Sequence, residues 1–221
     1  MKPLLTAALL ALALLSNISA PPRTLAADDK PSADDDGFVS LIPSDGDTLE
    51  GWKVDNDKQA GHWVLKDGVI TGDNPDKKGS ILWTEQAFGD YELVVEYRTT
   101  SEDYDSGVFL RGKSHQVQIG FSRSLKKDLT GALYCPKDGN GSYPQQPDEK
   151  IKDAHKPGEW NTLRMVTKGK QITTTLNGVQ INNYTAVKYP ATGKIGLQLH
   201  ANVHQTMAFR VVKIRTLGER D

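Results

Sequence analysis

The sequence lacks several features that define common classes of protein. It contains one cysteine in 221 residues, so neither an internal disulfide bond nor a C-x-x-C zinc site can form. It has no excess of basic residues: 27 Lys and Arg stand against 28 Asp and Glu, which removes the phosphate attraction that nucleic-acid binding needs. Its mean hydropathy of −0.51 argues against an integral membrane protein. Nucleic acid and membrane are therefore not expected partners, and Cys135 is expected to be an inert, packed thiol.

The N-terminus has the layout of a secretory signal peptide. Lys2 precedes an apolar run, residues 4–15, which is followed by the small-residue stretch 24–27. A membrane anchor is the alternative, but the run is shorter than the ~20 residues that a bilayer-spanning helix requires. We therefore predict that residues 1–26 are a signal peptide and that the protein is exported to the periplasm or secreted.

The segment that follows, residues 27–37, is acidic and almost free of apolar side chains. Because such a segment cannot bury enough apolar surface to offset the entropy of ordering it, we predict a disordered leader. One domain, residues 38–221, is then expected.

Short strands and turn signals fill this domain, with little helical periodicity. Asp67-Gly68 and Asn177-Gly178 each separate two short runs of strand-forming residues, which predicts two β-hairpins with tight turns. The spacing of the strand candidates is typical of an all-β sandwich of two antiparallel sheets. Six further strand candidates are Tyr91–Arg98, Ser106–Arg111, His115–Phe121, Thr162–Thr167, Lys194–His200 and Met207–Leu217.

Alternation along these strands separates apolar from polar side chains. If the strands are neighbours, one sheet presents a polar face suited to the hydroxyl groups of a sugar. A merely solvated face is the alternative, because antiparallel sheets often leave one face in water. The predicted polar face comprises Glu96, Arg98, Arg111, Gln116, Gln118, Gln198 and His200.

A second signal is the long connection 122–159, which shows no clear period. Connections of that length are uncommon unless they form a lid or a binding loop. Tyr134 and Tyr143 could stack on a sugar, with Gln145 and Gln146 supplying amides. A loop that only covers a sheet edge is the alternative.

Several short motifs stand out along the chain: Asp45 to Trp52, Trp63 to Ile70, Ser106 to Arg111, Thr130 to Tyr134 and Gly193 to His200. Together these motifs resemble the 3-keto-disaccharide hydrolase family of exported bacterial proteins. The resemblance runs from Phe38 to Leu217. It implies a concanavalin-like jelly roll and action on glycosides oxidised at C3 of a sugar ring.

One departure from the family pattern concerns its acids. Relatives often read Tyr-Glu-x-Gln-x-x-Asp on the strand after the Ser-Gly…Arg motif, whereas this sequence begins that strand His115-Gln116-Val117-Gln118 and lacks both carboxylates. If those acids carry the chemistry in relatives, this protein uses another acid, such as Glu96 or Asp105, or it has become a binder.

The chemistry of a 3-keto sugar indicates which side chains a hydrolase or lyase would need. The ketone acidifies the proton on C2, so a base can form an enolate that expels the C1 substituent, after which water adds. His200 is the best candidate base or acid, Arg111 the best enolate stabiliser, and Glu96 a candidate acid. Sugar-binding candidates are Gln116, Gln118, Gln198, Tyr134 and Arg98.

The sequence identifies no cofactor or metal site. A divalent cation could replace Arg111 as the enolate stabiliser, and the residue pattern does not decide between the two. The expected partner is a carbohydrate, in particular an oxidised disaccharide or glycoside. A lectin-like module that binds polysaccharide without turnover, and an exported structural domain, are the alternative functions.

Overall fold

The structure is a computed structural model that describes residues 37–44 and 46–218. The expected signal peptide, and the acidic leader up to residue 36, lie outside the described residues. Within the part of the chain that is described, no helix combines the length and the apolar character needed to cross a bilayer.

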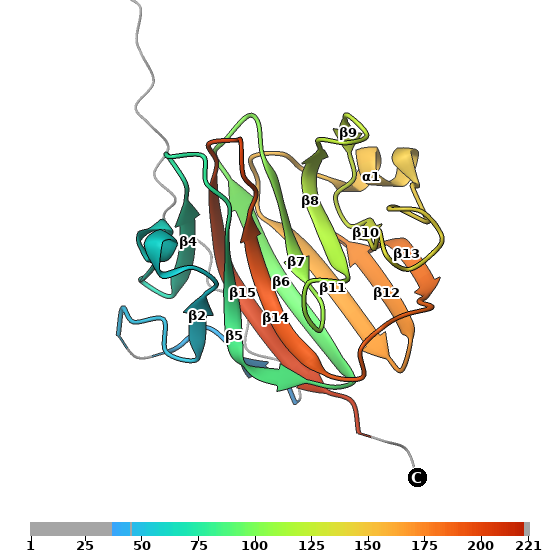
Figure 1. Cartoon of the computed structure of the whole chain (residues 1–221), viewed down its shortest axis with the longest axis horizontal. Helices are drawn as coiled ribbons and strands as arrows, with labels where there is room; N and C mark the ends of the chain where they lie inside the picture. The colour runs from blue at the N-terminus through green and yellow to red at the C-terminus, as the bar shows by residue number, and fades with distance from the viewer. Residues whose placement is uncertain (1–36, 45, 219–221) are drawn as a thin grey trace, which may run out of the picture.

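Two antiparallel sheets pack face to face as a sandwich, which confirms the predicted jelly-roll class (Figure 1). The sheet in front in Figure 1, here called the front sheet, has the order β10-β8-β7-β14-β5-β2, with β9 paired to β8. Its strands are β2 (Trp52–Val54), β5 (Ser80–Phe88), β7 (Asp105–Phe109), β8 (Gln116–Ser122), β9 (Lys127–Asp128), β10 (Leu133–Tyr134) and β14 (Gly193–Leu199).

The other sheet, here called the back sheet, has the order β13-β12-β11-β6-β15-β4-β3, with β1 paired to β15. Its strands are β1 (Val39–Ser40), β3 (Trp63–Lys66), β4 (Val69–Asp73), β6 (Tyr91–Thr99), β11 (Asn161–Lys168), β12 (Gln171–Leu176), β13 (Val179–Thr185) and β15 (Thr206–Thr216). All six strand candidates that the sequence indicates correspond to strands of one sheet or the other.

The core forms between the sheets because both contribute alternate apolar residues. On β6 the odd-numbered side chains are buried, with Leu93 and Val95 fully inaccessible. On the front sheet Val117, Ile119 and Leu197 are equally buried and face them. Successive side chains of a strand point to opposite faces, so residues between these positions lie on the outer faces of the two sheets.

Both predicted hairpins are present, and their turns have the expected geometry. Asp67 and Gly68 have φ values of 51° and 74°, and Asn177 and Gly178 have φ values of 48° and 84°. Two successive positive φ angles are the mark of a type I′ turn, which matches the twist of the flanking strands. The hairpins join β3 to β4 and β12 to β13.

The long connection 122–159 is more ordered than its sequence suggests. It contains β9, β10 and a short helix, α1 (Asp148–Ala154), which contacts β9 and β13. One further short helix, η1 (Asp57–His62), precedes β3. The connection therefore covers the β8 edge of the front sheet and carries aromatic side chains onto its outer face.

Candidate functional site

The predicted polar face is divided between the two sheets. Gln116 and Gln118 lie on β8 and Gln198 on β14, all in the front sheet, whereas Glu96 and Arg98 lie on β6 in the back sheet. Glu96 accepts a hydrogen bond from Nε of Arg210 at 2.7 Å. Glu96 and Arg98 are even-numbered residues of β6, so they point away from the core on the opposite surface of the sandwich. The prediction that they share a face with the glutamines is wrong.

The prediction that Arg111 lies on the polar face is also wrong. Arg111 has a φ of 52° that turns the chain just after β7, and its side chain is only 1% exposed. All five of its N–H donors are used: three go to the carbonyls of Gly89, Gly169 and Pro190, and the other two to Oδ1 of Asp90 and Oγ1 of Thr167. A guanidinium with every donor engaged inside the protein has none left for an enolate oxygen.

Arg111 and His200 do belong to the same sheet, but at its two opposite ends. Gly112, next to Arg111, donates to the carbonyl of Lys194, the second residue of β14, whereas His200 follows the last residue of that strand. The expectation that the two side chains frame one ligand is therefore wrong.

The candidate site is instead built around Asp105 on the outer face of the front sheet. Its carboxylate, 6% exposed, accepts a hydrogen bond from Nε2 of Gln118 on the neighbouring strand at 2.9 Å. Tyr143 donates its hydroxyl proton to Oε1 of the same glutamine at 2.9 Å. Burial raises the pKa of Tyr143 to about 12, so this hydroxyl remains a donor near neutral pH. The three side chains form one chain of hydrogen bonds in which the Gln118 amide has a single orientation.

His200 lies across from Asp105. In the register of β7 and β14, Ser106 pairs with Leu199, and the backbone N–H of His200 donates to the carbonyl of Asp105 at 3.2 Å. Residues directly opposite on one face of an antiparallel pair have Cβ atoms about 5 Å apart. Nδ1 of His200 lies 2.7 Å from the carbonyl oxygen of Ala201. Because a carbonyl can only accept, Nδ1 carries the proton, and the neutral ring holds its free lone pair on Nε2.

The backbone beneath this pair is held by two buried amides. Gln205 accepts from the N–H of Asp105 and donates to its carbonyl, both at 2.8 Å. Asn74 donates to the carbonyl of His200 at 3.1 Å and accepts from the N–H of Gln205 at 3.0 Å. The sequence analysis missed both residues, since neither has a local pattern that marks it.

Further along the same face, two more amides meet over a glycine. Nε2 of Gln116 donates to Oε1 of Gln198 at 2.6 Å. A Cβ on Gly107 would lie 2.1 Å from Nε2 of Gln116, so only glycine lets this side chain lie flat on the sheet. The predicted sugar-binding residues Gln116, Gln118 and Gln198 are thus brought together.

Tyr134 joins the same face from the long connection, at its partner position opposite Gln116 on β8. Its ring centroid is 5.1 Å from that of Tyr143. Gln145 and Gln146 do not take part, because their amides bond to the backbone of Asn183 and Tyr143.

Arg123 is a site residue that the sequence argument did not find. Its Nε is 3.8 Å from Oδ2 of Asp105, and its guanidinium also pairs with Asp103 at 2.8 Å. It follows β8, where strand alternation no longer predicts direction, so no local signal marks it. It places a positive charge beside Asp105, whereas the sequence argument expected Arg111 to supply the positive charge at an enolate oxygen.

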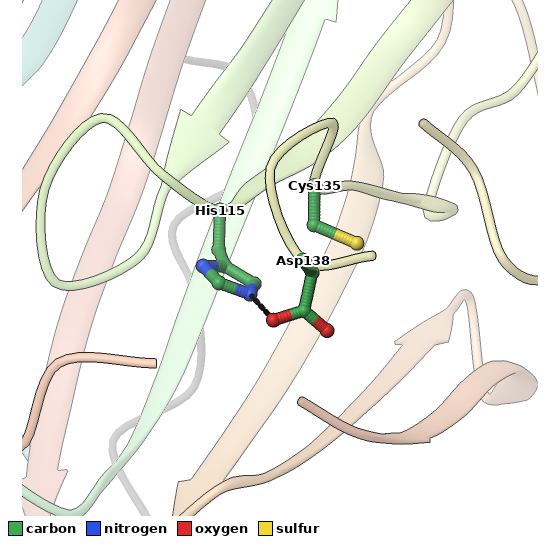
Figure 2. A group of neighbouring side chains, drawn as sticks. All are labelled: His115, Cys135 and Asp138. Atoms are coloured by element: carbon green, nitrogen blue, oxygen red, sulfur yellow. Dashed lines mark ion pairs between the residues drawn. The ribbon is translucent and has the colours of Figure 1, made fainter. Parts of the chain in front are cut away.

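Among the described residues, one group of side chains has the composition of a metal site: His115, Cys135 and Asp138 (Figure 2). All three are buried, and their potential ligand atoms lie within 4.8 Å of one another. Burial raises the pKa of Cys135 to about 11, with the Asp138 charge contributing, so the sulfur is a thiol near neutral pH.

The Asp138 carboxylate already has partners of its own. It accepts hydrogen bonds from the hydroxyl of Tyr184 at 2.6 Å and from the backbone N–H groups of Val187 and Lys188. This group therefore fastens the loop before β14 to the start of β8, which is a structural task, and Cys135 is packed as expected.

The sequence from residue 37 to 215 matches the family described as the 3-keto-alpha-glucoside-1,2-lyase-like domain. The chain belongs to this family. Among curated protein sequences, none matches it.

Solved structures with a similar fold include members of two functional groups. A "putative glycosyl hydrolase" of Parabacteroides distasonis is 21% identical with a TM-score of 0.59, over 81% of this lyase-like chain and 99% of that one. A second such protein of that organism is 25% identical with a TM-score of 0.55, over 82% and 84% of the two chains. The carbohydrate-binding module CBM66 of Bacillus subtilis is 12% identical with a TM-score of 0.50, over 75% and 96%.

Proposed function

We propose that this protein cleaves 3-keto-glycosides on the outer face of its front sheet, by removal of the C2 proton and elimination of the C1 substituent. The observation that carries the proposal is the pairing of Asp105, bound by Gln118, with His200 on the adjacent strand. Membership of a 3-keto-alpha-glucoside-1,2-lyase-like family supports the substrate class. The N-terminal sequence supports export, so we propose that the reaction takes place outside the cytoplasm.

His200 is the base in this scheme. Its proton is held on Nδ1 by the Ala201 carbonyl, so the lone pair on Nε2 can take the proton from C2. The electrons of the C2–H bond form the enolate and then expel the oxygen at C1, which takes up the proton from Nε2. Water subsequently adds to the double bond. No oxocarbenium ion forms, so the paired carboxylates of ordinary glycosidases are not required.

Asp105 and Arg123 provide the charges around this reaction. The Asp105 carboxylate lies across from the imidazole and stabilises the positive charge that His200 gains when it takes the proton. The Arg123 guanidinium, 37% exposed, is the positive group available to an enolate oxygen near Asp105. Gln116 and Gln198 orient hydroxyl groups of the neighbouring ring.

A non-catalytic carbohydrate-binding function is the second candidate. It is favoured by Gln116, which has an amide where relatives often have a carboxylate. Binding needs only the amides and tyrosines of the face, and not the lone pair of His200.

The test is to incubate the mature protein with a 3-keto-disaccharide and with its unoxidised parent, and to measure free sugar. We expect release from the ketone only. His200→Asn should lower the rate on the order of 10²-fold or more and leave sugar binding largely unchanged. Binding of the ketone without release would establish the second candidate and refute cleavage.

A matched control is His204→Asn. This histidine lies four residues further on, 53% exposed and paired with Asp73 at 3.0 Å, and it takes no part in the proposed reaction. The His204→Asn variant should release sugar at the same rate as the parent protein. Equal losses in both variants would contradict the role given to His200.

A further inference from the structure

Trp83 forms a flat platform at the other end of the front sheet's outer face. It lies opposite Gly196 in the register of β5 and β14. A Cβ on Gly196 would lie 2.7 Å from both Cε3 and Cζ3 of the indole, so the ring lies across the backbone of this glycine. The indole is half-buried, and its centroid is 5.4 Å from that of Phe109. One ring face is thus packed on the sheet, and the other is available to a ligand.

A pocket of about 400 Å³ contains this ring, and its rim is basic. Lys53, Lys113 and Lys194 line it, with Asp55 as its one acidic residue. Asp55 is compensated by Lys113, whose Nζ is 3.6 Å from its Oδ2. In the described part of the chain, neither Lys53 nor Lys194 has an ion-pair partner, and both are exposed. The pocket therefore has an excess of two positive charges in a chain whose formal net charge is −1.

The basic pocket and the Asp105–His200 pair lie on one continuous face. Gly196 and His200 are separated along β14 by ~13 Å at the usual rise of a strand, which is more than the width of one sugar ring. Gln116 and Gln198 lie between them. A ligand held at His200 can therefore extend over the two amides and reach Trp83.

We propose that this pocket is a subsite for an acidic sugar ring, one that bears a carboxylate or a sulfate group. The proposal rests on the proposed function, because it names the substrate class of the same face. The apolar face of the ring stacks on Trp83, and its anionic group lies between the ammonium groups of Lys53 and Lys194. A neutral sugar would leave the two ammonium groups without a partner, so the pocket discriminates by charge as well as by shape.

The experiment uses disaccharides that are not oxidised at C3, so that binding is measured without turnover. The mature protein is titrated with three sugars: cellobiose, the corresponding disaccharide that carries one uronate ring, and the 6-sulfate ester of cellobiose. Binding is measured by tryptophan fluorescence and by calorimetry. At low salt we expect the two acidic sugars to bind about fivefold or more tightly than cellobiose, as two exposed charge contacts allow. High salt should reduce this preference.

Substitutions test which residues cause the preference for acidic sugars. The double variant Lys53→Gln/Lys194→Gln should abolish the preference for acidic sugars, whereas Lys66→Gln/Lys168→Gln, two exposed lysines of the back sheet, should retain it. Trp83→Ala should weaken binding of all three sugars. Preference for the uronate alone, or for the sulfate alone, would identify which anionic group the pocket takes.

Equal affinities for neutral and acidic sugars, no binding of any of them, or a preference that survives in Lys53→Gln/Lys194→Gln would overturn the proposal. The test of the acidic-sugar subsite can be distinguished from the test of the proposed cleavage. A chain that prefers acidic sugars but releases nothing from a 3-keto-disaccharide contradicts only the proposed cleavage.

Discussion

Gln118 donates a hydrogen bond from Nε2 to Oδ1 of Asp105 at 2.9 Å, and this contact joins β8 to β7 on the outer face of the front sheet. Asp105→Asn would preserve the acceptor oxygen for this bond and remove the charge. We expect a loss of activity on a 3-keto-glycoside of about 10²-fold with an unchanged melting temperature. Single-turnover rates measure the effect, with Asp153→Asn at an exposed position of helix α1 as the control. An active Asp105→Asn enzyme would contradict the electrostatic role of this carboxylate.

Arg111 is expected to affect stability rather than chemistry. Arg111→Met removes the cationic partner of Asp90 and leaves three backbone carbonyls without the Arg111 donor, so the free energy of unfolding should fall by about 3 kcal/mol. Urea denaturation measures this change. Arg123→Met, which removes a half-exposed surface pair, should cost less than about 1 kcal/mol. A fully stable Arg111→Met protein would show that its contacts are dispensable.

The Asn177-Gly178 turn provides a test of backbone strain. Gly178 has a φ of 84°, where a β-branched residue is unfavourable although nothing lies within 4 Å of a Cβ there. Gly178→Val should therefore destabilise the fold by roughly 1–3 kcal/mol through strain alone. Gly61→Ala, in equally open space but without a positive φ, is the control and should be neutral. Thermal melts of the two variants distinguish strain from a general intolerance of side chains.

The lowered pKa of Asp138 predicts that the stability of the fold depends on pH. Burial alone would raise the pKa of its carboxyl, but hydrogen bonds from Tyr184 and from the N–H groups of Lys188 and Val187 hold the pKa below its ordinary value of 3.8. Because the pKa is lower in the folded state, this stabilisation is complete above the unfolded value, near pH 4, and is lost as the pH falls through the folded value.

The measurement compares the parent with Asp138→Asn at pH 6 and at pH 3. At pH 6 the variant should be less stable by about 2 kcal/mol, since hydrogen bonds to a charged acceptor are the strong ones. The difference should narrow at pH 3. A difference that stays constant would show that the charge of Asp138 does not matter.

Local structure could be predicted well from the sequence, because its causes are local. Alternation marks each long strand, and Asn177-Gly178 and Asp67-Gly68 supply the positive φ angles that a tight hairpin turn requires. Strand pairing could not be predicted in the same way. Glu96 alternates with apolar residues just as Gln118 does. Alternation shows that both side chains point away from the core, but it does not show to which of the two sheets each strand belongs.

The composition of the site was predictable only in part for the same reason. The three glutamines and His200 occupy alternating positions of strands that turn out to be neighbours. Arg111 follows a residue pattern that continues the strand, but its positive φ reverses the direction of its side chain. Arg123, Gln205 and Asn74 contact the site from loops or strand ends, where direction depends on the tertiary fold.

The contacts of Arg111 also bear on the order of folding events. They join it to residues between 21 and 79 positions away in the sequence: one on β11, and the others in the β5–β6 turn, the β11–β12 turn and the loop before β14. Such a cluster can assemble only once the strands around it are paired, so it should be missing from the transition state. Removing the Arg111 side chain should then mainly raise the unfolding rate, and leave the folding rate nearly unchanged. A chevron plot would show this as a shift of its unfolding limb alone. For a protein that we propose to act outside the cytoplasm, this residue would set how long the native state survives rather than how quickly it forms.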